Sequence, residues 1–138
     1  MKGAQDLIIG TILERLTGAE AIYIFGSFDT DGEMIGSDAD IAVLLPAGES
    51  ATVGALLLDE TRYALEKALG RDVHLLNLRR VPTVLQKEVI MADRRIHCGN
   101  LFAADTFEML VLSFYQKLNE ERAEVMAEGL SSGRFYNV

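Results

Sequence analysis

The sequence is poor in cysteine, in long apolar runs and in positive charge, and each shortage excludes a class of protein. A single cysteine, Cys98, rules out an intramolecular disulfide and suits a reducing compartment. No apolar run reaches the roughly 18 residues that a membrane-spanning helix needs. The amino-terminal MKGAQD also lacks the charged and apolar regions of a secretory signal. We therefore expect a cytoplasmic protein that is not held in a membrane.

Positive charge is scarce relative to negative charge, because 13 Lys and Arg face 21 Asp and Glu, which gives a net charge of −8. Binding to a nucleic-acid backbone depends on Lys and Arg, so this balance argues against nucleic acid as the direct ligand. Opposite charge speeds the encounter with a basic protein partner, and the acidic balance suits one. An acidic surface that only keeps the protein soluble explains the same charge.

The length and composition are those of one ordinary globular domain. The chain has 138 residues, of which 49% are hydrophobic and 25% charged. A chain of this size buries roughly 68% of its unfolded surface, which is enough for one core. We expect a single domain over residues 1–138.

Residues 20–45 carry the pattern around which the rest is organised. An apolar run over 22–25 ends at Gly26 and Ser27, as a buried strand does when it stops at a tight turn. Ten residues later a second apolar strand begins, and its first residues include Asp38 and Asp40. Side chains two apart in a strand point to the same face, about 6.6 to 6.8 Å apart. The two aspartates should therefore project side by side.

This arrangement favours chemistry on a nucleoside triphosphate. Two neighbouring carboxylates repel each other, and a hard divalent cation relieves the repulsion. Mg²⁺ is usually held by one or two carboxylates together with substrate phosphates. Gly26 lets the backbone approach a phosphate, Ser27 adds a hydroxyl donor, and the amides of a following helix would favour negative charge.

The remaining pattern alternates helices and strands, which indicates an α/β fold. The apolar spacing and the Gly and Pro positions predict helices over 5–17, 52–69, 82–93 and 102–128 and strands over 20–26, 39–45, 72–78 and 96–98. A loop is expected over 46–50. The strand–helix–strand unit predicts that 39–45 and 72–78 are parallel neighbours. The apolar stripe of the last helix is more typical of core than of an interface, although so long a helix can extend past a small core.

Gly-Ser, ten residues and then Asp-x-Asp resembles the motif of the polymerase-beta-like nucleotidyltransferases, and the short length is similar to their minimal (MNT) branch. That family has a third carboxylate on a neighbouring strand, where this sequence has Asp72. The resemblance implies a small mixed β-sheet with helices packed against it and a C-terminal helix. It covers residues 20–78 by motif and the remainder by the order of its elements.

The resemblance also implies a mechanism. Asp38 and Asp40 would bridge two Mg²⁺ ions, Asp72 would complete the second metal site and help deprotonate an acceptor hydroxyl, and Gly26 and Ser27 would hold the outer phosphates of ATP. Proteins of this size are similar to antitoxins that pair with HEPN-type ribonuclease toxins. By that resemblance the chain would be an adenylyltransferase that moves AMP onto a tyrosine of its partner toxin, within a hetero-oligomeric complex.

Two other classes stay open at this point. One is a nucleotidyltransferase for small molecules of the aminoglycoside type, whose members usually have an additional helical domain. The other is a non-catalytic antitoxin that neutralises its partner by binding alone. The presence of all three carboxylates weighs against an inactive site.

Several neighbouring residues allow two interpretations. Many relatives have an arginine directly after Gly-Ser, whereas this chain has Phe28, which leaves open which group neutralises the outer phosphates. Arg94 and Arg95 either steer phosphates or simply stabilise a helix C-terminus. His74 either approaches the site or is structural. The acids of the connector favour a solvated loop: Asp29, Asp31 and Glu33.

Overall fold

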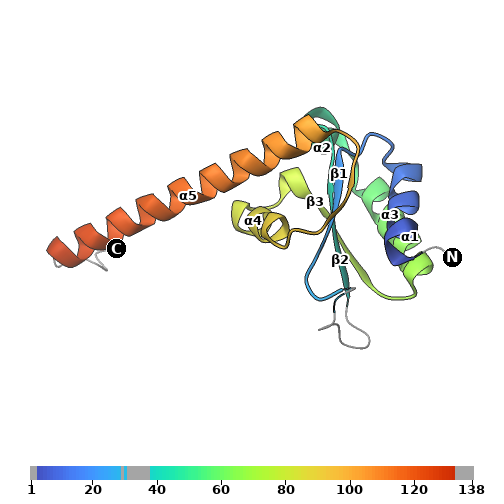
Figure 1. The fold of residues 1–138 in the computed structure, drawn as a ribbon, viewed down its shortest axis with the longest axis horizontal. Helices are drawn as coiled ribbons and strands as arrows, with labels where there is room; N and C mark the ends of the chain where they lie inside the picture. Colours follow the sequence, from blue (N-terminus) through green and yellow to red (C-terminus); the bar gives the residue numbers. More distant parts are fainter. Residues whose placement is uncertain (1–2, 29, 31–37, 133–138) are drawn as a thin grey trace.

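The protein is built on a mixed sheet with helices on both faces (Figure 1). The computed structural model describes residues 3–28, 30 and 38–132. Within them the strand order is β3-β2-β1-β4. The strands are β1 (Ala21–Phe25), β2 (Ala39–Leu44), β3 (Val73–Asn77) and β4 (Arg95–Cys98). β1 pairs antiparallel with β2 and β4, whereas β2 and β3 are parallel, so the predicted mixed sheet and the predicted parallel pair are both confirmed.

Two helical layers cover the two faces of this sheet. The helices α1 (Ala4–Arg15) and α3 (Ala55–Leu69) lie on one face, and α4 (Thr83–Met91) and α5 (Leu101–Ser132) on the other (Figure 1). A short helix α2 (Ala47–Thr52) and a 3₁₀ turn η1 (Leu78–Arg80) complete the described elements. The predicted helix–strand order is thus confirmed, with boundaries shifted by a few residues at most of the elements.

Strand alternation divides the hydrophobic residues between two cores. On β1, Ile22 and Ile24 pack toward α1 and α3, whereas Ala21 and Tyr23 pack toward α4 and α5. The alternation continues on β2, where Ala39 and Ile41 belong to the first core and Ala42 and Leu44 to the second: all are buried. Because successive side chains point to opposite faces, the face of every residue in the sheet follows from this register.

One predicted helix, 52–69, is wrong at its start, as is the predicted loop over 46–50. The chain forms α2 there, and Val53 and Gly54 then adopt extended conformations before α3 begins. The reason is a polar link that local pattern does not reveal. The buried Ser50 donates a hydrogen bond to Asn77 Oδ1 at 2.9 Å, and Asn77 Nδ2 donates to the Ser50 carbonyl at 3.1 Å. These bonds hold α2 against the end of β3.

The helix α5 is tied at its base to the start of β1. The carbonyl of Glu20 accepts hydrogen bonds from the amides of Gly99 and Asn100, at 2.9 and 3.2 Å. Asn100 then caps the helix, because its side-chain oxygen accepts the amide of Ala103 at 3.0 Å. From this base α5 runs over the sheet and projects well beyond it (Figure 1). Of the helices in the described ranges, none is long and apolar enough to cross a membrane.

Candidate active site

The three predicted carboxylates lie at one end of two adjacent parallel strands. Asp38 and Asp40 are at the start of β2, and Asp72 directly precedes β3. The Ala39 amide donates to the Asp72 carbonyl at 2.9 Å, which brings the entrances of the two strands level. Ala39 is buried in the core under α1 and α3, so alternation turns Asp38 and Asp40 to the face that carries α4 and α5.

Asp40 is the most perturbed of these acids. Its side chain is 28% exposed, and its Oδ1 lies 3.6 Å from Nδ1 of His74, the residue opposite it on β3. Desolvation raises the pKa of Asp40; His74 opposes that rise and the negative charge of Asp38 adds to it. His74 therefore approaches the site, which answers the question that its sequence position left open. A partly buried acid with a raised pKa beside a second acid is typical of a functional site.

The Gly-Ser turn folds directly over Asp40. Phe25, the last residue of β1, pairs with Asp40, so the following Gly26 passes over the carboxylate. Gly26 has φ +70°, a left-handed conformation that other residues adopt at a cost. A Cβ at this position would lie 3.3 Å from Cγ of Asp40 and would overlap its Oδ2. Only glycine satisfies both requirements, which makes the turn and the carboxylate one geometric unit.

Ser27 is exposed next to this unit, but its surroundings differ from the expectation in one respect. The predicted helix directly after Gly-Ser is not present in residues 26–28 and 30, which form a turn and a bend. The turn is closed instead by Thr30, whose amide and hydroxyl donate to the Ser27 carbonyl at 3.2 and 2.6 Å. Ser27 therefore offers its own hydroxyl and the turn amides, without the help of a helix terminus at these residues.

An arginine from a distant part of the chain holds the turn. Arg94 Nη1 donates to the Gly26 carbonyl at 3.1 Å, and Nη2 donates to the Phe28 carbonyl. Its own carbonyl accepts the amide of Ile24 at 3.0 Å. Asp93 directs this contact, because its φ of 56° ends α4 in a left-handed residue and turns the chain toward β1.

The neighbouring Arg95 has a different role. Its Nη1 binds Asp105 at 3.0 Å and Glu108 at 2.6 Å, both on α5. Glu108 also accepts the hydroxyl of the buried Tyr23 at 2.7 Å. Burial and Glu108 raise the pKa of Tyr23, so the hydroxyl stays protonated and structural. The two adjacent arginines, which the sequence could not distinguish, thus divide between the Gly-Ser turn and the base of α5.

One further cation beside the turn was not predicted from the sequence. The guanidinium carbon of Arg71 lies 4.8 Å from the ring centroid of Phe28, a cation–π distance. Phe28 itself is 3% exposed and packs in the core under α1 and α3. The residue that replaces the usual arginine therefore supports an arginine from another strand entrance. The connector acids Asp29, Asp31 and Glu33 lie outside the described residues.

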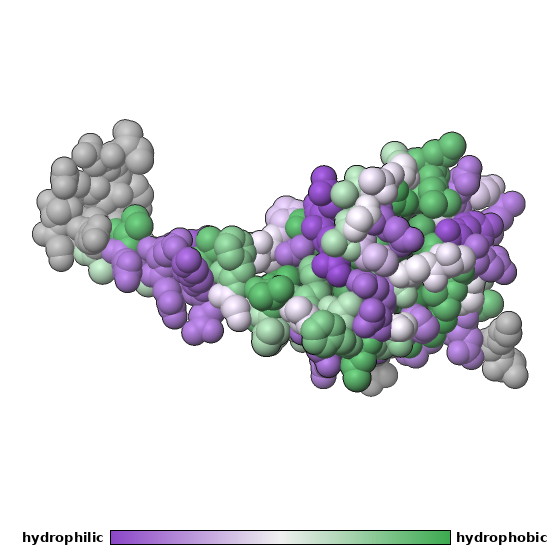
Figure 2. All heavy atoms as spheres, turned by 90° about the horizontal axis from the view of Figure 1, so that it is seen from above, coloured by the Kyte–Doolittle hydropathy of each residue, from purple (hydrophilic) through white to green (hydrophobic). Residues whose placement is uncertain are grey.

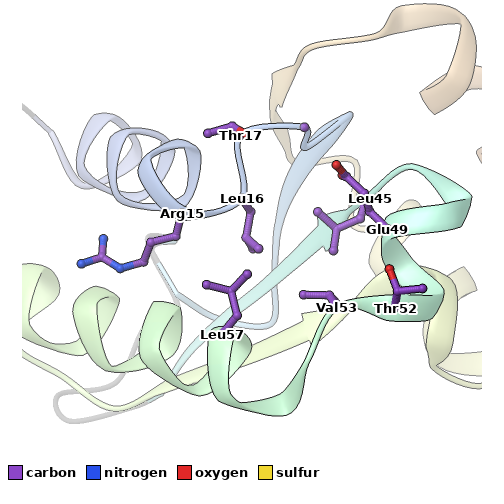
Figure 3. Close-up of a pocket in the computed structure, with 9 residues that line it drawn as sticks. Arg15, Leu16, Thr17, Leu45, Glu49, Thr52, Val53 and Leu57 are labelled. Carbon is purple, nitrogen blue, oxygen red and sulfur yellow. The ribbon is translucent and has the colours of Figure 1, made fainter.

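Two of the hollows among the described residues lie beside the sheet, and one of these two adjoins the turn. A polar cavity of about 220 Å³ is lined by Tyr23, Ile90, Asp93, Arg94, Arg95 and Glu108, so Arg94 belongs to both the cavity and the turn. The other, of about 190 Å³, lies at the opposite end of β2. There Leu16, Leu45 and Leu57 point toward one another from three elements (Figure 3). Its mainly aliphatic wall does not resemble a phosphate site.

The donor set fits a hard cation only when substrate oxygens complete it. Across the described ranges, no three His, Cys, Asp or Glu side chains gather closely enough to hold a metal ion. Asp38 and Asp40 supply two neighbouring carboxylates, and the raised pKa of Asp40 reflects the cost of keeping its charge there. One or two carboxylates with substrate phosphates is the usual Mg²⁺ environment in proteins.

Comparison with known proteins agrees with this geometry. Residues 8–101 match the family described as polymerase beta, nucleotidyltransferase. A curated relative, the protein adenylyltransferase MntA of Shewanella oneidensis, is 28% identical over 93% of this chain and 88% of its own length.

Two solved structures also resemble the chain closely. A toxin–antitoxin crystal structure with AMP-PNP has a TM-score of 0.76 and 28% identity, over 91% of this chain and 98% of the other. A complex of a tri-AMPylated Shewanella oneidensis HEPN toxin with its MNT antitoxin has a TM-score of 0.72 and 28% identity, over 92% and 96%. With the family match spanning most of the domain and the Gly-Ser turn closing over Asp40, the chain belongs to the polymerase beta nucleotidyltransferase family.

Proposed function

We propose that this protein is a Mg²⁺-dependent protein adenylyltransferase that transfers AMP from ATP to a tyrosine hydroxyl of a HEPN-type toxin and so acts as its antitoxin. The observation that carries the proposal is the contact between the Gly26 turn and the Asp40 carboxylate. A turn that suits phosphates is placed against a carboxylate pair that suits a cation, and a nucleoside triphosphate needs both at once.

The residues of the chain then divide the work of the reaction. Asp38 and Asp40 would hold Mg²⁺, which supplies charge neutralisation at the phosphates when it is bound. The amides of the turn and the Ser27 hydroxyl bind the outer phosphates, with Arg94 fixing the turn through its two carbonyls. The acceptor oxygen attacks the α-phosphorus, the bond to the β-phosphate breaks, and pyrophosphate leaves. Asp72, which is exposed and directly precedes β3, receives the hydroxyl proton.

The acceptor is inferred from the relatives. MntA is named a protein adenylyltransferase, and a similar antitoxin was crystallised with a tri-AMPylated HEPN toxin. The site described here is open and formed at strand ends, so a partner protein can present a side chain to it. ATP as the nucleotide agrees with the structure that contains AMP-PNP. A substrate and partner of this kind support a cytoplasmic location.

A binding-only antitoxin is the alternative that one observation favours. The three carboxylates do not gather into a three-ligand cluster among the described residues, as they would in a fully preformed metal site. The position of Asp40 favours the enzyme instead, because this partly buried acid lies beside Asp38 and directly under the Gly26 turn, and its pKa is raised there.

The decisive experiment is incubation of the purified protein with ATP, Mg²⁺ and the product of the adjacent gene, followed by intact-mass spectrometry. The proposal expects the partner to gain the mass of one or more AMP groups and to stay inactive after the two proteins are separated. A partner that regains full ribonuclease activity on separation, with no gain of mass, would establish the binding-only class. AMP transfer to an aminoglycoside but not to the protein would establish the small-molecule class.

A further inference from the structure

The helix α5 has an apolar stripe that is longer than the domain on which it packs. Ala104, Val111, Leu118 and Val125 follow one another at intervals of seven residues, and Phe107 and Phe114 accompany them at the same interval. A seven-residue spacing keeps side chains on one side of a helix and is the pattern of a helix–helix seam. All six side chains therefore belong to one continuous stripe.

Exposure along this stripe rises steadily from the base of the helix to its far half. Ala104 is fully buried and Val111 is 7% exposed, whereas Val125 is 67% exposed. The aromatic pair shows the same change, from 8% at Phe107 to 52% at Phe114. Figure 2 shows hydrophobic side chains along the helix where it leaves the body of the domain. Since the side chains are apolar along the whole stripe, their exposure differs because of what packs beneath each of them.

The supporting layer ends near Tyr115. Up to that point the stripe packs on α4, through the core that includes Val89 and Ile90. Lys87 of α4 closes the seam, with Nζ 5.0 Å from the ring centroid of Tyr115. Beyond it the stripe continues with the half-buried Leu118 and the exposed Val125, and the exposed Met126 lies next to Val125 at its edge. This part of α5 projects past the other elements of the described chain (Figure 1). A helix face of this kind is normally covered.

The uncovered part of the stripe faces the side on which the reaction takes place. The helices α4 and α5 cover the sheet face to which Asp40 points, and α5 projects outward on that side (Figure 1). A body seated under the projecting half therefore lies beside the catalytic face. The six residues of β2 span about 20 Å between the end where α5 is anchored and the aspartates, so an object that touches both is of protein size.

We propose that the far part of the stripe, formed by Phe114, Leu118 and Val125 with Met126 at its edge, is the docking surface for a helix of the acceptor toxin. The inference rests on the proposed function and names where its partner binds. A second copy of this chain is the poorer occupant, because a net charge of −8 makes two copies repel each other. The segment 117–124 contributes to this with three glutamates against one lysine and one arginine. A basic partner is attracted by the same charge.

The test compares two double variants that add the same charge to opposite sides of α5. Leu118→Glu/Val125→Glu alters the stripe, and Ser113→Glu/Ala127→Glu alters exposed positions on the other side. Binding of each full-length protein to the toxin is measured by calorimetry, and thermal melting and ATP binding are measured on the same preparations. We expect the stripe variant to bind about a hundredfold more weakly, with melting and ATP binding within experimental error of the control variant.

The outcomes separate the docking surface from the proposed chemistry. If the stripe variant binds the toxin as tightly as the control, the docking inference is wrong even where AMP transfer by the wild type stands. If the wild type binds through the stripe but transfers no AMP, the docking surface stands and the proposed chemistry fails. Sedimentation of the protein alone is the last measurement. If the wild type and the control variant are dimers, the stripe variant is a monomer and all three bind the toxin equally, the stripe is the interface with a second copy.

Discussion

The two ends of the sheet are built from the same three strands and differ in what their charges do. At one end Arg79 binds the Glu20 carboxylate at 2.7 Å and also donates to the Leu45 carbonyl, and both side chains are mostly buried. At the other end two aspartates lie next to each other under a left-handed glycine, and desolvation raises the pKa of Asp40. The first end stabilises the fold. The second holds two carboxylates whose mutual repulsion a bound cation would relieve. Stability is therefore sacrificed for function at the end that carries the aspartates.

The largest effect is expected when both aspartates of the candidate active site are replaced. Asp38→Asn/Asp40→Asn should lower AMP transfer by about a thousandfold or more, because both carboxylates that would hold the cation lose their charge. Single-turnover transfer with radiolabelled ATP measures this, and circular dichroism shows whether the fold is kept. Wild-type transfer by the double variant would mean that the chemistry lies elsewhere on the molecule.

Gly26→Ala tests whether the turn and the carboxylate act as a unit. The new methyl group would overlap the Asp40 carboxylate at a left-handed position, so one of them must move. Misplacement of about 1 Å can cost a hundredfold in rate, which is the loss that we expect here. Gly70→Ala is the matched control, because Gly70 has a similar φ of +68° but open space around it. If both variants lose only stability, the close approach has no catalytic meaning.

Arg94 lies in the connection between α4 and β4 and holds the turn at the end that carries the aspartates. Arg94→Ala removes two hydrogen bonds to the turn and should lower transfer about tenfold to a hundredfold, mainly through a higher KM for ATP. Arg94→Lys keeps the charge without the two-pronged geometry. If lysine restores the KM, Arg94 acts by its charge on the phosphates; if it does not, Arg94 acts by holding the turn.

At the opposite end the expected loss is one of stability alone. Arg79→Ala leaves Glu20 partly buried without its cation and should lower the free energy of unfolding by about 2 kcal/mol. For a domain of this size that corresponds to a fall of roughly 6 to 8 °C in Tm. Transfer per folded molecule should be unchanged. A large catalytic defect in this variant would show that the two ends are coupled.

The smallest expected effect is a gain of stability rather than a loss. Because the folded state raises the pKa of Asp40, the native protein binds more protons than the unfolded chain between the ordinary and the raised pKa. The stability of the ligand-free protein should therefore fall as the pH rises through that window. Asp40→Asn should remove this dependence and raise the Tm slightly at neutral pH, in thermal melts recorded from pH 4 to 8. A variant that melts earlier than the wild type at neutral pH contradicts the assignment.

Local pattern was sufficient for the elements and for the motif residues, and it failed where distant parts of the chain meet. The strands around Asp38, Asp40 and Asp72 were predictable because short apolar runs and the Asp-x-Asp spacing are local signals. The break between α2 and α3 was not, since it depends on Ser50 meeting Asn77. Arg94 and Arg95 are adjacent and chemically identical, so only the left-handed residue before them and their partners in space distinguish them.

The anchoring of α5 to Glu20 has a mechanical consequence. Both bonds at the base of the helix join at one carbonyl, and a Cβ on Gly99 would lie 2.9 Å from the Ala19 carbonyl, so the joint has little room to adjust. The 32 residues of α5 form a rod of about 48 Å, and a rotation of about 10° at its base displaces the far end by roughly 8 Å. The contacts at the base therefore set the direction in which the whole helix points. Any change at Gly99 would be felt most strongly at the distant tip, far from where it is made.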